Sequence, residues 1–366
     1  ELRGAFGADS MRAWSRMLIR DNPYAWAAKE SIVSKVIGTG FGFQSSLEAK
    51  DGTDEPDTNE NRDRIFKEWC EVCDINGELT FDEIQVLAYG EMVEAGECLL
   101  HYVTVPLKQH GIRRPVPLAI ELIEADRLAA DFDTYTLNRD RSDGHRITRG
   151  VEMDQHGRPV AYWIYPAHPT EPNVLKRTPE RIPASRIKHL FRKDRIGQSR
   201  GVTWFAPVIE PLRSLGTYTE NEMQASAVAS CFTTAITTET PLSNGMPPSA
   251  GNDTQDAVSK DFSKTSYSSS RTSENDNKPR YRRWQAYWQH HCCQGTWDRF
   301  CEAAAIVGLK EFPTMVELLS DRRLSSPVEI MPPVTGSDGK TRKGTPRPNF
   351  ARGCPSDSSR RHRQPG

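Results

Sequence analysis

The chain has 366 residues, 36% of them hydrophobic, and its 48 Lys and Arg nearly balance its 49 Asp and Glu. This length and composition allow two or three domains with an ordinary hydrophobic core, whereas a formal net charge of −1 excludes a protein that holds nucleic acid through its overall charge. No apolar run approaches the ~18 residues of a membrane span, so no membrane partner is expected.

The first predicted element is a long, interrupted helix. Apolar residues recur at helical spacing over residues 10–37, with a break at Asn22 and Pro23. An Asn side chain caps a helix and Pro suits the first helical turn, so a second helix is expected to begin at this break. Gly38 and Gly40 mark its end.

Short helices and strands are predicted next. Polar composition predicts a loop over residues 48–61 and apolar spacing a short helix over 65–73. Thr80 and Glu83 have the spacing of a capping box and predict a helix that ends near Ala95. Runs rich in β-forming residues then predict strands over 98–105, 118–123, 150–153, 161–165 and 187–191.

The longest predicted helix follows a charged, glycine-containing turn. Its pattern covers residues 203–237, and Pro207 and Pro211 place its regular start near Leu212. Residues 239–258 are rich in Pro, Gly, Ser and Asn, which predicts a loop.

The C-terminal part begins with a helix pair or a bent helix over residues 281–308 and loses its periodicity from about residue 325. Residues 331–366 carry eight Lys or Arg against two Asp and almost no apolar residues, so disorder is expected there. Taken together, the elements predict an α+β fold.

The segment from His189 to Ile209 has the pattern His-Leu-Phe, Arg, Gly-Gln, Arg-Gly, Ala-Pro. Together with five others it forms an ordered set of six segments, 20–24 with 36–41, 69–74 with 80–82, 124–128, 150–162, 189–209 and 261–271. These six segments resemble the motifs of one family, the lambda-type phage portal proteins, which form the rings through which tailed phages package DNA.

The resemblance implies a non-enzymatic portal subunit without cofactor, metal or catalytic residues. It implies a dodecameric ring of this chain that passes double-stranded DNA during packaging and ejection and connects head and tail. Terminase, capsid or scaffold, and head–tail joining proteins would be its partners. Its place would be the portal vertex of the virion, with the host bacterial cytoplasm as the site of assembly.

The resemblance also divides the chain into regions and singles out motif residues. The regions would be a mostly helical, wing-like part (1–114), a β-rich part (115–200), a long stem or channel helix (201–238), a shortened loop (239–260), a helical part (261–325) and a disordered basic tail (326–366). The motif and assembly residues would be Asn22, Pro23, Gly38, Gly40, Asp126, Gly150, Glu152, Gly157, His189, Arg195, Gly197, Gln198, Arg200, Gly201, Pro207, Tyr267, Ser268, Ser269 and Arg271.

The chain departs from the family pattern at two places. Family members have a substantial segment where this chain has only the connection 238–258, and the pattern that starts at 331–336 turns into Arg-, Pro- and Ser-rich residues. A shifted reading frame would produce such a tail. A decayed prophage copy, and with it a non-functional portal remnant, is therefore the alternative hypothesis.

Basic residues interleaved with aromatic ones at 278–284 leave two interpretations open. The cations would contact DNA phosphates while Tyr281 and Trp284 stack, or the segment is a solvated helix face whose aromatics belong to the core. A nucleic-acid-binding module is thus a competing function. Mixed charges at 192–195 and at Arg200 favour ion pairs between subunits. The candidate DNA contacts are Lys278, Arg280, Arg282 and Arg283.

Other residue groups favour structural roles over chemistry. Cys70 and Cys73, with the His and Cys residues at 290–293, would supply zinc ligands, but they lie more than 200 residues apart and buried free thiols are common. Cys98 with His101 or His110 is a weak candidate nucleophile, because a strand Cys packed in a core is the better interpretation. Asp126, Asp131 and Asp133 lack the loop glycine of a calcium site.

Overall fold

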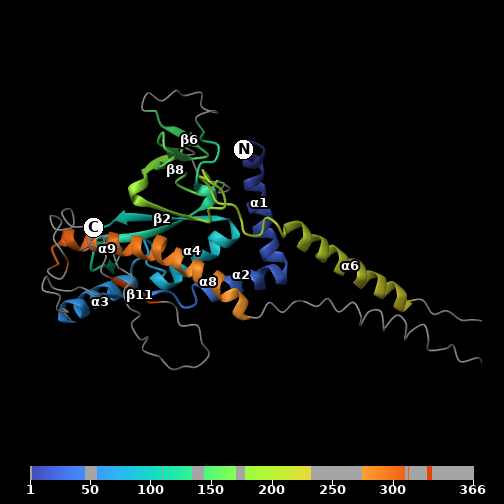
Figure 1. The fold of residues 1–366 in the computed structure, drawn as a ribbon, viewed down its shortest axis with the longest axis horizontal. Helices are drawn as coiled ribbons and strands as arrows, with labels where there is room; N and C mark the ends of the chain where they lie inside the picture. Colours follow the sequence, from blue (N-terminus) through green and yellow to red (C-terminus); the bar gives the residue numbers. More distant parts are fainter. Residues whose placement is uncertain are drawn as a thin grey trace, which may run out of the picture. The chain divides into compact units, whose positions relative to one another are not determined.

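The computed structural model shown in Figure 1 combines helices from both ends of the sequence with β-sheets between them, which confirms the predicted α+β class. None of the helices in the described part of the chain is both long and apolar enough to cross a membrane. The structure describes residues 2–45, 56–109, 111–133, 144–169, 178–231, 274–309, 312 and 328–331.

Two helices form the N-terminal part, α1 (Leu2–Asp21) and α2 (Pro23–Val36), and they confirm the predicted break. The side chain of Asn22 accepts hydrogen bonds from the backbone N–H groups of Tyr24 (2.9 Å) and Ala25 (3.2 Å). These bonds satisfy N–H groups that have no partner within the first turn of a helix.

Helix α3 (Pro56–Cys70) begins earlier than predicted, so the predicted loop 48–61 is wrong from residue 56 onward. Its first turns are polar, but Asn59 and Arg62 are buried there, as are Phe66 and Trp69 farther along. This one-sided burial holds a helix whose N-terminal half lacks an apolar pattern. Helix α4 (Phe81–Glu94) has the predicted capping box between Thr80 and Glu83.

A three-stranded antiparallel sheet of order β10–β2–β5 separates two hydrophobic cores. Successive side chains of a strand point to opposite faces. Accordingly, Cys98, Leu100 and Tyr102 belong to the core that holds the helices, and Leu99 belongs to the core shared with a second sheet. The strands are β2 (Glu97–Thr104), β5 (Leu118–Glu124) and β10 (Ile187–Phe191).

The second sheet has four antiparallel strands in sequence order. Val151, Tyr162 and Ile164 from this sheet pack against Leu99 and Ile123 of the first sheet. The strands are β6 (Arg146–Thr148), β7 (Val151–Met153), β8 (Pro159–Ile164) and β9 (Glu180–Pro183).

The predicted bent helix consists of α8 (Glu274–Trp288) and α9 (Gln294–Val307), joined by a π-helical segment (Gln289–Cys293). Its buried Trp288 and Trp297 pack into the core of the N-terminal helices, although they are distant in sequence. The N-terminal and C-terminal helical parts therefore share one core.

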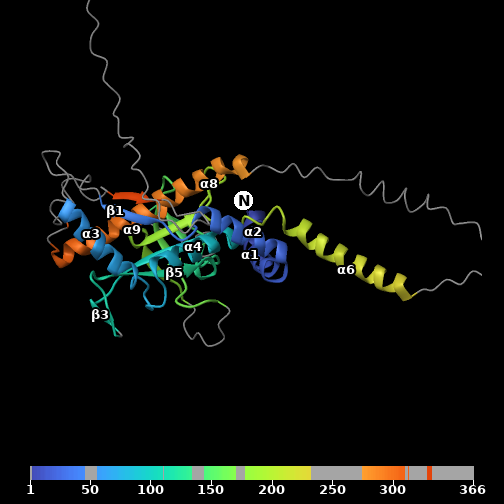
Figure 2. The same cartoon turned by 90° about the horizontal axis from the view of Figure 1, so that it is seen from below.

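Helix α6 (Ile209–Cys231) extends away from the other elements in both Figure 1 and Figure 2. It begins at Ile209 rather than near Leu212, because Pro211 falls in the first turn, where its missing N–H costs nothing. Ile209 is buried and Leu212 partly buried, but from residue 213 to 231 every side chain is exposed.

A two-stranded antiparallel sheet joins β1 (Gly42–Ser45) to β11 (Val328–Met331), so the predicted disorder of 326–366 is wrong for these four residues. Strand β2 pairs with both β5 and β10, and the predicted regions 1–114 and 115–200 thus contribute to one sheet. A short hairpin is formed by β3 (Lys108–Gln109) and β4 (Ile112–Arg113).

Candidate functional site

The turn between β10 and α6 carries most of the predicted motif and is organised by Gln198. The Oε1 of Gln198 accepts hydrogen bonds from the backbone N–H groups of Asp194 (2.9 Å) and Arg195 (3.2 Å). Its Nε2 donates to the carbonyl oxygens of Arg192 (3.3 Å) and Arg200 (2.8 Å). One amide side chain thereby fixes four backbone groups, which explains a Gln at this place in the turn.

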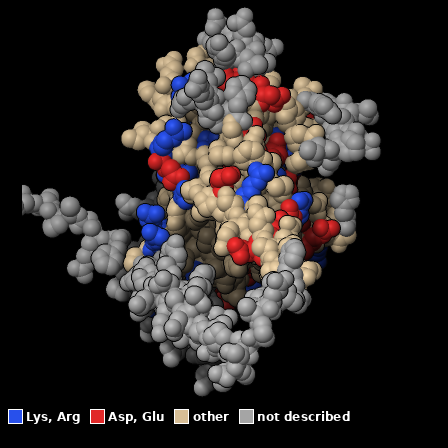
Figure 3. Space-filling view, turned by 90° about the vertical axis from the view of Figure 1, so that its right-hand side faces the viewer, with Lys and Arg blue, Asp and Glu red and all other residues tan. Residues whose placement is uncertain are grey.

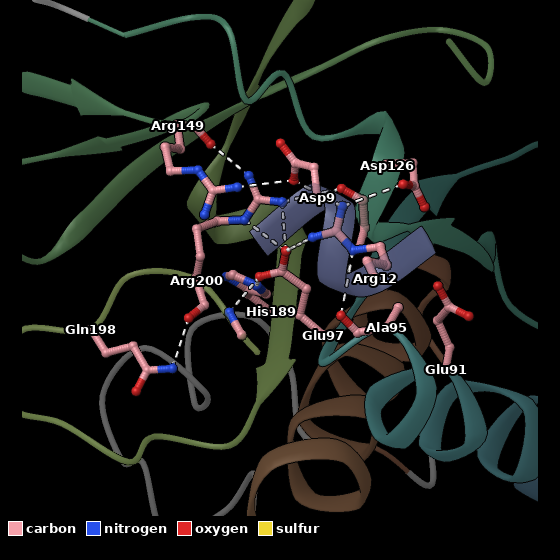
Figure 4. Close-up of polar contacts among 12 residues, drawn as sticks. Asp9, Arg12, Glu91, Ala95, Glu97, Asp126, Arg149, His189, Gln198 and Arg200 are labelled. Atoms are coloured by element: carbon pink, nitrogen blue, oxygen red, sulfur yellow. Dashed lines mark hydrogen bonds and ion pairs between the residues drawn. The ribbon is translucent and has the colours of Figure 1, made fainter. Parts of the chain in front are cut away.

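A cluster of charged groups around Glu97 lies at the end of this turn (Figure 4). The Oε1 of Glu97 accepts hydrogen bonds from Arg12 Nη2 (3.1 Å) and Arg200 Nε (2.7 Å). Its Oε2 accepts one from the backbone N–H of Gly201 (2.7 Å) and lies 3.0 Å from His189 Nε2. We call Arg12, Glu97, His189, Arg200 and Gly201 the Glu97 cluster.

The carboxylate of Glu97 is completely buried. Burial alone would raise its pKa, but the positive charge of Arg200 and the hydrogen bond with His189 outweigh burial and hold the pKa well below its usual range. A buried carboxylate with this many donors stays ionised, and removing a single partner would leave an uncompensated charge. The cluster therefore connects α1, β2, β10 and the turn.

Arg200 has a different role from the one expected. Besides Glu97, its guanidinium donates to the carbonyl oxygens of Arg149 (2.7 Å) and Ala125 (3.2 Å), and the residue is buried. The predicted ion pair between subunits is wrong for Arg200, because its donors are satisfied within the chain. Arg195, by contrast, is exposed on the turn.

Gly201 is required by a close approach of two backbone segments. A Cβ atom at this position would lie 2.1 Å from the carbonyl oxygen of Gly96, a distance that real contacts do not show. The turn is thus pressed against the start of β2, which brings the Gly201 N–H to Glu97. Five of the glycines that the resemblance singled out have a positive φ, and these are Gly38, Gly40, Gly150, Gly157 and Gly197.

Helix α1 adds a second set of ion pairs beside the cluster. Asp126 accepts from Arg12 Nη1 (3.3 Å) and forms an ion pair with Arg16, which also binds Glu91 at 2.6 Å. Burial raises the pKa of Glu91 to about 7 despite the opposing charge of Arg16. Glu91 and Glu97, only six positions apart, thus have pKa values shifted in opposite directions.

Glu152 is a second fully buried carboxylate, and it holds the four-stranded sheet. Arg181 on β9 binds it through two hydrogen bonds, Nε to Oε2 (2.9 Å) and Nη2 to Oε1 (3.0 Å). Trp163 Nε1 donates to Oε2 at 3.2 Å, and His145 Nδ1 lies 3.1 Å from Oε1. The resemblance singled out Glu152, whereas nothing in the sequence indicated Arg181 as its partner.

The segment that leads into α6 is tied to α1 and α4. The hydroxyls of Ser15 and Thr203 share a hydrogen bond (2.9 Å), and the backbone N–H of Trp204 donates to the carbonyl of Val93 (3.1 Å). Arg192 lies over the ring of Trp204 at 4.9 Å. The exposed Pro207 follows this anchored segment and precedes the helix.

The basic residues of α8 all lie on its exposed side, and we call Lys278, Arg280, Arg282 and Arg283 the basic face of α8. On the other side of the helix, Trp284 packs on Trp204 with ring centroids 4.7 Å apart, and Trp288 is buried. The aromatic residues of α8 therefore pack against the hydrophobic core, as the interpretation of this segment as a solvated helix face predicts. DNA contact by the cations stays a prediction.

The buried cysteines are placed as packing residues. Burial raises the thiol pKa of Cys73, Cys98 and Cys293, which disfavours the reactive thiolate. His101, the predicted helper of Cys98, instead pairs with Glu121 at 3.0 Å. Among the residues that the structure describes, no three ligand atoms of the two Cys-containing segments gather at ligand distance, so the hypothetical zinc set is not assembled.

The three predicted aspartates do not form a cation site. Asp131 accepts a hydrogen bond from the Tyr165 hydroxyl (2.8 Å), and Asp133 accepts one from the backbone N–H of Arg149 (3.3 Å). Glu124, Asp126 and His168 bring ligand atoms within 4.8 Å of one another, but Asp126 is already neutralised by two arginines. The motif residues Tyr267, Ser268, Ser269 and Arg271 lie outside the described residues, as does the predicted loop 239–260.

Surface charge is mixed. On the face of the molecule in Figure 3, basic and acidic side chains lie interspersed rather than in one field of a single sign. Such a surface suits specific protein contacts more than strong attachment to a polyanion.

Comparison with known proteins identifies the family. The model of the family described as phage portal protein, lambda family, matches residues 4–257, which is more than half of the chain. A probable portal protein of Halomonas phage phiHAP-1 is 28% identical over 223 residues, covering 60% of this chain but only 41% of that protein. A solved chain from the neck of an empty GTA particle computed with C6 symmetry has a TM-score of 0.34 and 11% identity, and the match covers 87% of this chain and 83% of that chain. The chain belongs to the lambda family of phage portal proteins, a family of structural, non-enzymatic virion components.

Proposed function

We propose that the chain is a ring subunit of a phage portal, forming the channel for DNA packaging and ejection and the connection between head and tail. Family membership supports this role, and the observation that carries it for this chain is α6. A helix in water obtains most of its stability from packing, yet among the described residues α6 packs on the chain only near its first turn.

The exposed part of α6 has one face that suits close packing with neighbouring helices. Residues at i, i+3 and i+4 spacing share a helix face. Apolar side chains, Gly216 and three small hydroxyl side chains follow this spacing along α6, whereas Thr217, Asn221 and Gln224 lie on the opposite side. The residues of this face are Leu212, Leu215, Gly216, Thr219, Met223, Ser226, Ala227 and Ser230.

A ring built from such subunits would conduct DNA without gripping it. Each phosphate that is held by Lys or Arg strengthens binding and must be released as DNA advances. A chain with a net charge of −1 and an interspersed surface suits this need. Terminase would supply the energy, and capsid, scaffold and head–tail joining proteins would be the remaining partners.

The test is the mass of the purified chain by light scattering after size exclusion, with negative-stain images of the main peak. Closed rings of about a dozen subunits support the proposal. A monomer or a soluble aggregate without rings contradicts it and favours the non-functional remnant.

The exposed basic face of α8 favours a second candidate, a nucleic-acid-binding module, which predicts tight, salt-sensitive duplex binding by the monomer.

A further inference from the structure

A groove of about 840 Å³ opens between α3, β1 and the start of α4. Phe43 and Phe66 contribute an aromatic floor, with ring centroids 4.6 Å apart. Arg64 and Lys67 are its cationic residues. The carboxylates that line it outnumber them, and these are Asp57, Glu60, Asp63, Glu71 and Asp82.

Arg64 pairs with Glu68 (2.7 Å) outside the groove, and the described residues show no ion pair of a groove carboxylate within 4 Å. Asp63 and Asp82 accept hydrogen bonds from the backbone N–H of Ser45 (2.7 Å) and from Gln85 Nε2 (3.2 Å). Burial raises the pKa of Asp63. Burial and two neighbouring carboxylates also raise the pKa of Asp82. The groove therefore carries an excess of negative charge that a cationic partner would neutralise.

The chain carries a complementary surface on the basic face of α8. Lys278, Arg280 and Arg282 are exposed, and Lys278 and Arg282 lie one helical turn apart. Arg283 is also exposed, although its guanidinium lies over the ring of Trp284 at 5.3 Å.

The basic face of α8 cannot fill the groove of its own chain. Trp297 of α9 packs against Phe66 at the groove floor, with ring centroids 5.0 Å apart. Arg283 precedes Trp297 by fourteen residues of α-helix and π-helix, a separation on the order of 20 Å along the chain of helices. Figures 1 and 2 also show α3 and the start of α8 apart in both views.

We propose that the groove receives the basic face of α8 from a second copy of this chain. A ring requires a heterologous contact, in which one surface of a subunit meets a different surface of the next. The groove and the basic face of α8 are two such surfaces with opposite charge, and charge complementarity fixes which surfaces meet. This inference rests on the proposed ring and names one contact within it.

Charge reversal tests the contact. The groove variant carries Glu60→Lys and Glu71→Lys, and the helix variant carries Lys278→Glu and Arg282→Glu; all four side chains are exposed and lie outside the core. Each variant alone is expected to raise the protein concentration for half-maximal ring assembly at least about tenfold, as read by mass photometry. The control reverses Glu78 and Arg158, which are exposed elsewhere, and is expected to assemble like the wild type.

An equimolar mixture of the two variants gives the decisive result. In a ring of alternating variants, every reversed groove meets a reversed helix and every native groove a native helix. The mixture is therefore expected to form rings at a concentration where neither variant does, which also shows that both are folded. Failure of the mixture, or normal assembly of both single variants, overturns the contact while wild-type rings leave the portal proposal intact.

Two further outcomes separate the alternatives. A wild-type chain that forms no rings overturns both the portal proposal and this contact. Normal rings of the helix variant together with weakened binding to duplex DNA assign the basic face of α8 to nucleic acid instead.

Discussion

The Glu97 cluster and helix α6 differ in where their stabilising partners come from. Every oxygen of the Glu97 carboxylate is bound within the chain, by groups from α1, β10 and the turn. Helix α6 follows directly from that turn, yet almost all of its side chains face solvent. An anchor whose charges are satisfied within the chain thus carries a helix that the described part of the chain leaves almost unpacked, and the proposed ring would supply packing partners for it.

The largest effect is expected at the anchor. Glu97→Gln removes the charge that Arg12, Arg200 and His189 share, and leaves the buried guanidinium of Arg200 without its anion. We expect the free energy of unfolding to fall by about 3–5 kcal/mol in urea titrations. Glu78→Gln, at an exposed site, is the matched control. A loss below about 1 kcal/mol would mean that the cluster is not the anchor.

Replacing glycine by alanine should change the free energy of unfolding in opposite directions in the two regions. Gly201→Ala forces a Cβ against the Gly96 carbonyl and is expected to lower the free energy of unfolding by about 1–3 kcal/mol. Gly216→Ala in α6 meets no neighbouring atom and is expected to stabilise the isolated subunit by up to about 1 kcal/mol. Equal losses at both positions would show that α6 is packed in the monomer.

The pH dependence of the free energy of unfolding should distinguish the contribution of Glu91 from that of Glu97. The pKa of Glu91 is raised to about 7 in the folded chain, so folding takes up a proton and the free energy of unfolding rises as the pH falls from about 8 toward 5. We expect a gain on the order of 2 kcal/mol that Glu91→Gln abolishes.

The lowered pKa of Glu97 acts in the other direction. Its contribution is fully present above the unfolded pKa of about 4.3 and is lost as the pH falls through the lower folded value. Thermal unfolding between pH 8 and pH 3 measures both effects. A monotonic decrease in stability from pH 8 downward would contradict the assignment to Glu91.

The smallest effect on stability is expected in α6. Leu215 is exposed in the single subunit, so Leu215→Glu should change the free energy of unfolding by less than about 0.5 kcal/mol. The same substitution should prevent ring formation, as measured by light scattering. Thr217→Glu on the opposite side of the helix is the control. Rings of the Leu215 variant would remove this face of α6 from the proposed subunit contact.

Features with a local signal could be predicted from the sequence. The cap at Asn22, the capping box at Thr80 and the β-rich strands each depend on neighbouring residues, and the structure confirms them. The early start of α3 has no such local signal, because its first turns are polar and the burial of Asn59 and Arg62 depends on tertiary contacts such as that of Arg62 with the Trp297 ring.

Features that depend on distant pairing had no such signal. The partners of Glu97 lie 85 to 104 positions away along the chain, and a single Glu at the start of a strand gives no indication of them. Strand β11 likewise exists through its pairing with β1, within a segment whose composition predicts disorder. The charge of Arg200 is evident from the sequence, but its burial depends on contacts with residues that are distant along the chain.

The shared core of the N-terminal helices and α9 has a consequence for synthesis on the ribosome. Buried Arg62 reaches Cys301 across 239 positions of sequence, and Phe66 packs on Trp297. At roughly 5–20 residues per second, α3 waits about 10 to 50 seconds for these partners to be translated. Phe81 of α4 reaches Phe66 and Trp69 early, but their contacts with Trp297 and Phe300 form only after α9 has been translated.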